Sequence, residues 1–91
     1  MKREDLSIIH ERMPPDTNEV RHFHNKSRQF FFILKGKASI EINGIVHELT
    51  QHEGIEIPPQ ITHQIFNRSS SDIEFLVISH PTTKGDRTLD N

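Results

Sequence analysis

The chain contains no cysteine, no tryptophan and no tyrosine among its 91 residues. Without cysteine it can form no disulfide, no thiolate metal site and no cysteine nucleophile, so any metal must be held by nitrogen and oxygen donors. Without tyrosine it also lacks the phenolic acid that a metal-free sugar epimerase would pair with a histidine and a carboxylate. The side chains available as metal ligands are therefore carboxylates, amides and imidazoles, and seven histidines supply the last of these.

Long apolar runs and an excess of one charge are also missing. The apolar start, Leu6-Ser7-Ile8-Ile9, is too short for a signal-peptide core or a membrane-spanning helix. A formal net charge of -2, with no dense run of Lys or Arg, argues against a protein that works mainly on nucleic acid or on an anionic membrane. We therefore expect a cytoplasmic protein whose partners are small molecules or other proteins.

The short chain sets a limit on the size of the core. Hydrophobic residues make up 32% of the sequence, and a domain of this size buries only about 60% of its unfolded surface. We expect a single domain over residues 1–91, with the barrel core at about 6–80 and a polar C-terminal arm over 81–91 that lies on the surface or is frayed. A bound metal or a second subunit would help to stabilise such a domain.

Short β-favouring runs separated by turn residues fill the sequence, and no stretch of ten or more residues shows the apolar period of a helix. Residues 38–42 alternate between apolar and polar, and Asn43-Gly44 then predicts a type I′ hairpin into residues 45–49. The other expected strands cover residues 6–9, 20–24, 29–34, 55–57, 62–67 and 73–79. Around eight short strands at this spacing predict an all-β sandwich or barrel.

One of these runs is apolar at every position. Residues 30–34 read Phe-Phe-Phe-Ile-Leu, so both faces of their strand must be covered, and residues 75–78 repeat the pattern. The cover for the second face is either another sheet of the same chain, which makes a monomer, or another copy of the chain. We expect a homodimer, because large exposed apolar patches are uncommon on monomers.

Histidines stand at spacings that suit a metal site. His22 and His24 lie two residues apart, so a strand places both on one face, about 6.6 Å apart along the backbone. Gln29 follows a short turn and would point into the same barrel from the returning strand, and His63 begins another strand. Three imidazoles and one oxygen are a typical transition-metal ligand set that leaves positions open. A His-x-His pair alone is a weak signal among seven histidines.

The wider spacing is more specific. His22-x-His24, four residues, Gln29, six residues and Gly36 resemble the first motif of the cupin superfamily, and Pro58-x-Gln60-x-x-His63-x-x-x-Asn67 resembles part of the second. The resemblance, to the small single-domain "cupin 2" type, spans residues 12 to 80. It implies a cupin double-stranded β-helix, a small jelly-roll-like barrel. It also implies one divalent transition metal ion (Fe, Ni, Mn, Zn or Cu) held by His22, His24 and His63, with Gln29 as the fourth ligand.

Two positions depart from the family pattern. The glutamate ligand of the family is Gln29 here, and a glycine of the second motif is Gln60, which has less access to positive φ. Neutral ligands alone leave the charge of a divalent ion uncompensated, which favours an anionic molecule such as a carboxylate or an enolate. Two alternatives stay open: Gln29 hydrogen-bonds a water on the metal, or the histidines are packed strand residues of a cupin that has lost its metal.

The resemblance implies a fold and a pocket more directly than a reaction, because cupins include dioxygenases, isomerases, epimerases, decarboxylases and sugar-sensing domains. We expect a metal-dependent small-molecule enzyme, dioxygenase- or isomerase-like, that acts on a small anionic substrate in the barrel. No catalytic residue is assigned, because the motif contains no acidic general base; proton transfer would fall to a hydroxide on the metal or a spare histidine. The alternative is a non-catalytic module that binds a sugar or a carboxylate and reports it to a partner protein.

Overall fold

Every regular element of the described residues, 5–81 and 86–89 in our computed structural model, is a β-strand. The ten strands are β1 (Ser7–Met13), β2 (Thr17–Asn18), β3 (His22–His24), β4 (Arg28–Lys35), β5 (Ala38–Ile42), β6 (Ile45–Leu49), β7 (Gly54–Ile57), β8 (His63–Asn67), β9 (Ile73–His80) and β10 (Arg87–Leu89). Over these residues there is no helix long and apolar enough to cross a membrane. The all-β class predicted from the sequence is confirmed.

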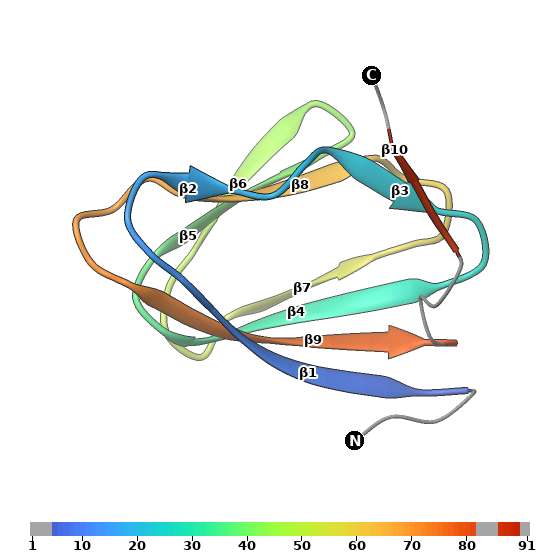
Figure 1. Cartoon of the computed structure of the whole chain (residues 1–91), viewed down its shortest axis with the longest axis horizontal. Helices are drawn as coiled ribbons and strands as arrows, with labels where there is room; N and C mark the ends of the chain where they lie inside the picture. Colours follow the sequence, from blue (N-terminus) through green and yellow to red (C-terminus); the bar gives the residue numbers. More distant parts are fainter. Residues whose placement is uncertain (1–4, 82–85, 90–91) are drawn as a thin grey trace.

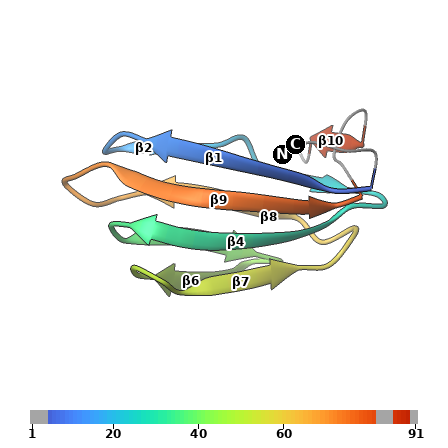
Figure 2. The same cartoon turned by 90° about the horizontal axis from the view of Figure 1, so that it is seen from below.

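The strands form two antiparallel sheets that face each other (Figure 1). Sheet A has the order β1-β9-β4-β7, and Figure 2 shows these four strands side by side. Sheet B has the order β10-β3-β8-β5-β6, and β2 also pairs with β8. Because neighbours in the sheets are far apart in sequence, as in the β4–β9 and β3–β8 pairs, the two sheets are wound together into the predicted barrel.

Turn residues account for the two tightest reversals. Asn43 and Gly44 have φ values of 51° and 86°, as a type I′ turn requires, and the hairpin pairs Ile42 with Ile45. Gly36, between β4 and β5, has a φ of 86°, and an added Cβ there would lie 2.9 Å from the carbonyl oxygen of Asp72. Both reversals therefore depend on residues that accept positive φ.

The core lies between the sheets. Phe31 and Ile33 of β4 point inward and are almost fully buried, and Phe31 stacks on Phe75 of β9 with ring centroids 5.9 Å apart. Ile40 of β5 and Ile65 of β8 face them from sheet B with exposures of 0% and 1%. Each such side chain contributes roughly 1.5–3 kcal/mol by leaving water. This layer fixes the spacing between the sheets and therefore the width of the barrel.

The second face of the apolar run in β4 is the outer face of sheet A. Phe30 is 38% exposed there, and it lies in register with Ile78 of β9, which pairs in turn with Ile8 of β1. Phe32 and Leu76 form the next row of the same face. The predicted division of residues 30–34 between two faces is thus confirmed, and one of those faces lies outside the barrel.

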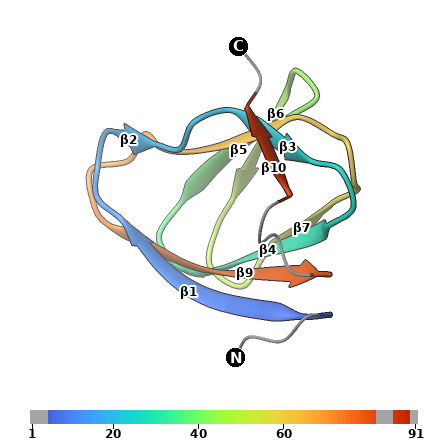
Figure 3. The same cartoon turned by 45° about the vertical axis from the view of Figure 1, so that its right-hand side comes forward.

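Three stretches differ from the sequence prediction by more than one residue. The strand predicted at residues 20–24 begins only at His22, and the short strand β2 lies before it at residues 17–18, which were predicted to be a loop. Strand β1 runs on to Met13, four residues beyond its predicted end, because its pairing with β9 extends from Ser7 to Met13. The segment after Pro81, predicted to be a surface arm or a frayed tail, contains strand β10, which pairs with β3 (Figure 3). Residues 82–85 and 90–91 of that segment lie outside the described residues. The prediction missed this strand because three residues are too few to show a period, whereas the free edge of β3 offers them partners.

Candidate metal centre

Three histidines converge inside one end of the barrel. His22 and His24 occupy the two inward positions of β3, and His63, the first residue of β8, pairs directly with His22. Their relative exposures are only 4%, 4% and 1%. One ring nitrogen from each histidine can be chosen so that all three atoms lie within 4.8 Å of one another. The structure therefore brings together the three histidines that the sequence singled out, in an arrangement that can hold a metal ion.

Backbone carbonyls orient all three rings. The Nδ1 atoms of His22, His24 and His63 lie 2.6, 3.2 and 3.0 Å from the carbonyl oxygens of Val20, Asp86 and Ile61, respectively. Because a carbonyl oxygen only accepts, each Nδ1 must carry the proton, and the lone pair of each neutral imidazole is then on Nε2. Such bonds to the distal ring nitrogen are what fix the tautomer of metal-ligating histidines.

Gln29 reaches the same space from sheet A. It is 6% exposed, and its Nε2 donates to the Ser79 hydroxyl of β9 over 3.1 Å. Its Oε1 is buried and has no hydrogen-bond partner among the residues that the structure describes. Leaving a buried amide oxygen without a hydrogen-bond donor costs free energy. This oxygen is therefore suited to bind a metal ion through one of its lone pairs.

Beside the two histidines of β3 and Gln29 lies a small pocket of about 120 Å³. It is lined by Ile9, Glu11, Glu19, His22, His24, Gln29, Phe31, Val77 and Ser79. Glu11 points inward from β1, where it lies in register with the core residue Phe75, and Glu19 belongs to the connection between β2 and β3. The sequence analysis found no acidic group for this site, and the structure supplies two.

Comparison with known families identifies the domain. Residues 9–79 match the model of the family described as "Cupin domain". The chain belongs to the cupin domain family. The matched segment contains all three histidines and Gln29.

One curated relative and two solved structures are similar to this chain at low sequence identity. The probable oxidoreductase yanE of Aspergillus niger is 30% identical over 73 residues, which cover 76% of this chain and 28% of that protein. An uncharacterized conserved protein with a double-stranded β-helix domain from Klebsiella pneumoniae has a TM-score of 0.89 at 18% identity, with 100% and 79% of the two chains covered. A sugar phosphate isomerase of the cupin superfamily from Silicibacter pomeroyi has a TM-score of 0.79 at 21% identity, with 86% and 52% covered. This chain spans between 28% and 55% of the length of three curated relatives.

Asp86, next to β10, supports the end of this cupin that contains the three histidines. Its carboxylate accepts hydrogen bonds from the backbone amides of Asn25, Lys26 and Ser27, at 3.0, 2.9 and 2.9 Å, and its carbonyl oxygen faces His24. Burial works to raise the pKa of Asp86, but the three amide bonds and the electrostatic effect of His24 outweigh it and lower the pKa. Sequence analysis missed this residue because its partners lie about sixty positions away.

Gln60 occupies the position where the family motif has glycine. It adopts a φ of 68°, the left-handed conformation that glycine would enter without strain, and its amide donates to the carbonyl oxygen of His24 over 2.6 Å. The turn thus keeps the glycine-like backbone although the side chain is large. Its function here is to hold the end of β3 against the β7–β8 connection.

Proposed function

We propose that this cupin binds one divalent transition metal ion through His22, His24 and His63, with Gln29 as the fourth protein ligand. The observation that carries the proposal is the common orientation of the three rings, each held through Nδ1 by a carbonyl oxygen. The unsatisfied Oε1 of Gln29 supports a direct bond from the amide oxygen to the ion. Nitrogen and oxygen donors of this kind accept Fe, Ni, Mn, Zn or Cu according to supply.

The pocket supports a metal-dependent enzyme that acts on a small molecule. When bound, the ion would polarise an oxygen of the substrate as a Lewis acid. Glu11 and Glu19 line the same pocket and are suited to take up and return a proton, while Phe31 and Val77 contribute apolar wall. Two carboxylates beside the histidines favour proton-transfer chemistry, as in an isomerase, over a dioxygenase reaction.

A small anionic substrate suits these dimensions and charges. A volume of about 120 Å³ admits a molecule of few atoms, well below the size of drug-like ligands. The substrate's anionic group would face the ion, because none of the proposed ligands brings a negative charge. Glu11 and Glu19 would repel a second anionic group and accept hydrogen bonds from hydroxyls instead. The substrate class is therefore a small hydroxylated acid.

We also propose that the protein is a homodimer formed through the outer face of sheet A. Ile8, Phe30, Phe32, Leu76 and Ile78 form an apolar patch there. Polar contacts border it, an ion pair of Arg28 with Glu56 at 2.7 Å and a hydrogen bond of His10 with Glu74 at 3.0 Å. An apolar centre with a polar rim is typical of protein interfaces. Sedimentation equilibrium should give twice the chain mass, and Phe30→Glu should give the monomer, whereas Ile45→Glu on the exposed hairpin should stay dimeric.

The cytoplasmic location stays a prediction from the sequence.

Metal content is the decisive measurement for the site. Purified protein, reconstituted with each candidate ion and then dialysed, should retain about one equivalent by plasma mass spectrometry. The double variant His24→Ala/His63→Ala should retain none, and His52→Ala, which removes an exposed histidine of the β6–β7 turn, should behave as the native protein. Retention of metal by the double variant at the native level would refute the assignment.

A solvent-exchange assay then tests the reaction. Metal-loaded protein in deuterium oxide should catalyse deuterium incorporation next to the carbonyl of a small hydroxy-keto acid, followed by proton NMR. Glu11→Gln should reduce this exchange by about 10²-fold or more, the usual contribution of general base catalysis, while keeping one equivalent of metal. Stoichiometric metal with saturable binding of such acids and no exchange would instead support the non-catalytic binding module.

A further inference from the structure

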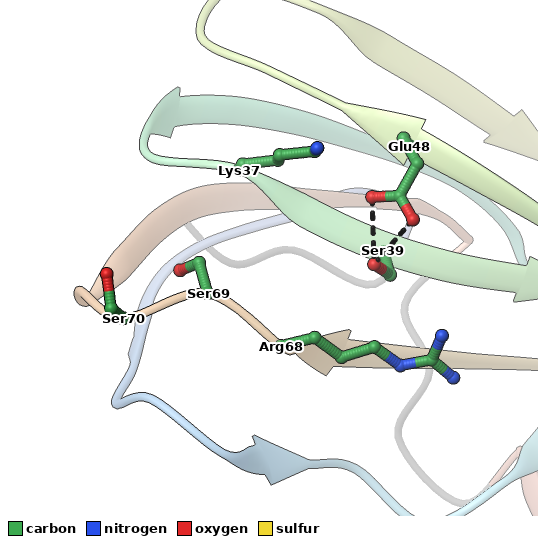
Figure 4. Close-up of a pocket in the computed structure, with 6 residues that line it drawn as sticks. All are labelled: Lys37, Ser39, Glu48, Arg68, Ser69 and Ser70. Carbon is green, nitrogen blue, oxygen red and sulfur yellow. Dashed lines mark hydrogen bonds between the residues drawn. The ribbon is translucent and has the colours of Figure 1, made fainter.

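A second hollow, larger than the metal pocket, lies on the outer face of sheet B (Figure 4). Its volume is about 340 Å³, and it is lined by Lys37, Ser39, Glu48, Arg68, Ser69 and Ser70. None of these residues lines the histidine pocket. His63 begins β8 and faces the barrel interior, whereas Arg68 follows the other end of that strand. The two hollows are therefore separate sites, and nothing inferred for this one rests on the proposed metal chemistry.

Arg68 differs from the other arginines whose side chains the structure describes. Arg12, Arg21 and Arg28 each have a carboxylate oxygen within 4.0 Å. Arg68 instead lies over an aromatic ring, with its Cζ 4.6 Å from the centroid of the Phe66 ring. This cation–π contact positions the guanidinium and leaves its N–H edge available for a ligand. The hollow thus contains an arginine that is held in place and has no carboxylate partner within residues 5–81 and 86–89.

Lys37 supplies a second cation without a carboxylate partner among the described residues. In Figure 4 the Lys37 side chain extends toward Glu48, whereas the Arg68 side chain runs along β8 on the other side of Ser39. The buried Ser39 hydroxyl lies 3.0 and 2.9 Å from the two carboxylate oxygens of Glu48, which holds this carboxylate at one side of the hollow. Two cations against one carboxylate leave the hollow with a net positive charge.

The turn that closes the hollow is held by hydrogen bonds. The Asn67 amide donates to the carbonyl oxygens of Met13 and Ser71, at 2.9 and 2.8 Å, and its Oδ1 accepts from the backbone amide and hydroxyl of Ser69. The neighbouring Ser70 is exposed, and no hydrogen bond of its hydroxyl is recorded within the described part of the chain. The turn therefore presents a free donor on a fixed backbone.

We infer that this hollow binds the phosphate group of a small phosphorylated molecule. The planar N–H edge of Arg68 and the Lys37 ammonium are donors suited to a tetrahedral oxyanion, and the Ser70 hydroxyl lies at the other end of the hollow from the guanidinium (Figure 4). A hollow of about 340 Å³ is larger than a bare phosphate needs, so the remainder of the ligand also finds room. Glu48 would accept hydrogen bonds from hydroxyl groups on that remainder and disfavour a second anionic group.

Amide chemical shifts of ¹⁵N-labelled protein test this inference directly. Inorganic phosphate and glucose 6-phosphate are titrated separately at constant ionic strength, with sodium chloride as compensation, so that screening stays fixed. Saturable shifts are expected for residues 37–39 and 68–71 and none for the residues around His63. Tighter binding of glucose 6-phosphate identifies an ester as the ligand, and equal binding identifies free phosphate. Shifts that do not saturate, or that sodium chloride reproduces, would overturn the site.

Variants that are expected to change the phosphate affinity in opposite directions distinguish a loss of binding from misfolding. Arg68→Ala should weaken phosphate binding about tenfold, the loss of one charge-assisted contact, and Lys37→Ala should weaken it several-fold. Glu48→Gln keeps an acceptor for Ser39 but removes the opposing charge, so it should strengthen binding. Lys26→Ala, which removes an exposed lysine next to β3, should change nothing. Native affinity in Arg68→Ala, or weaker binding in Glu48→Gln, contradicts the assignment.

Discussion

In the histidine pocket the donors come from buried strand positions, and hydrogen bonds orient each of them, whereas the hollow of Arg68 carries its charges on exposed side chains. His63 is 1% exposed and its ring is fixed by the carbonyl oxygen of Ile61. Lys37 and Arg68 are exposed, and only the guanidinium is positioned, by Phe66. Fixed donors select by geometry, as a metal ion requires, while long cationic side chains select by charge and adapt to different anions. Two faces of one sheet thus favour two different classes of ligand.

The largest expected effect comes from adding a charge to the histidine pocket. Gln29→Glu restores an anionic ligand and keeps the hydrogen bond with Ser79, because the serine hydroxyl can donate to the new carboxylate. Metal affinity should rise by at least about tenfold, since a negative ligand offsets the charge of the ion. Competition with a chromogenic chelator measures the affinity, and Gln51→Glu in an exposed turn is the matched control. Equal affinity in Gln29→Glu and native protein would show that Gln29 does not ligate.

A smaller effect is expected from loosening the orientation of one ring. Asp86→Ala removes the acceptor of three backbone amides and frees the segment whose carbonyl oxygen faces His24. Loss of such an outer contact typically lowers metal affinity by about tenfold or more, and retention of the other two rings should keep the loss near the lower end of that range. Asp72→Ala, which removes the 3.7 Å pair with Arg12, is the control. Unchanged affinity would mean that packing alone orients His24.

The local part of this architecture was predictable because its causes are local. Alternation within a strand fixes the face of a side chain, so His22 and His24 had to share one, and Asn43-Gly44 specified its hairpin. The apolar run at residues 30–34 likewise had to divide between the two faces of β4. The prediction that His63 lies beside the other two histidines came from the spacing shared with the cupin family. A pattern within one strand could not have predicted it.

The missing site residues depend on contacts between distant segments. Glu11 was assigned to no strand, because His10, Glu11 and Arg12 interrupt the apolar alternation; the pairing of β1 with β9 extends the strand through them. Glu19 comes from an irregular connection, where side-chain direction follows no period. Asp86 acts on residues that lie 59 to 62 positions earlier in the sequence. Propensity and spacing carry no information on such contacts, which is why the acidic groups of the pocket appear only in the structure.

Relieving the backbone strain at Gln60 tests whether this residue supports the histidine pocket through its backbone amide alone, without its side chain. Gln60→Gly removes the cost of a φ of 68° for a residue with a Cβ, so the free energy of unfolding should rise by about 1 kcal/mol. Metal affinity should not change, because the amide that bonds to His24 remains. Urea denaturation measures the first quantity, and Gln51→Gly, at a turn position whose own φ is not positive, should not stabilise. A weaker metal site in Gln60→Gly would assign the side chain a part in the pocket.

The smallest expected effect belongs to a turn outside both hollows, which provides a baseline for a carboxylate oriented in open solvent. Glu53 accepts hydrogen bonds from the amide and the hydroxyl of Thr50, at 2.7 and 2.9 Å. These hydrogen bonds lower the pKa of Glu53 from its ordinary value of 4.5, and the bond from the amide has the larger effect. Burial opposes them with a smaller effect. A lowered pKa means that the ionised carboxylate stabilises the folded state.

The pH dependence of that contribution has a definite sign. It is fully present above the unfolded-state pKa, near 4.5, and is lost as the pH falls through the lower folded-state value. The difference in urea midpoint between native protein and Glu53→Gln should therefore be constant at neutral pH and shrink below that value. Thr50→Val, which deletes the hydroxyl but keeps the amide donor, should retain most of the dependence because the amide bond is the larger cause. A difference that stays constant through the acid range would show that the Thr50 bonds do not distinguish carboxylate from carboxylic acid.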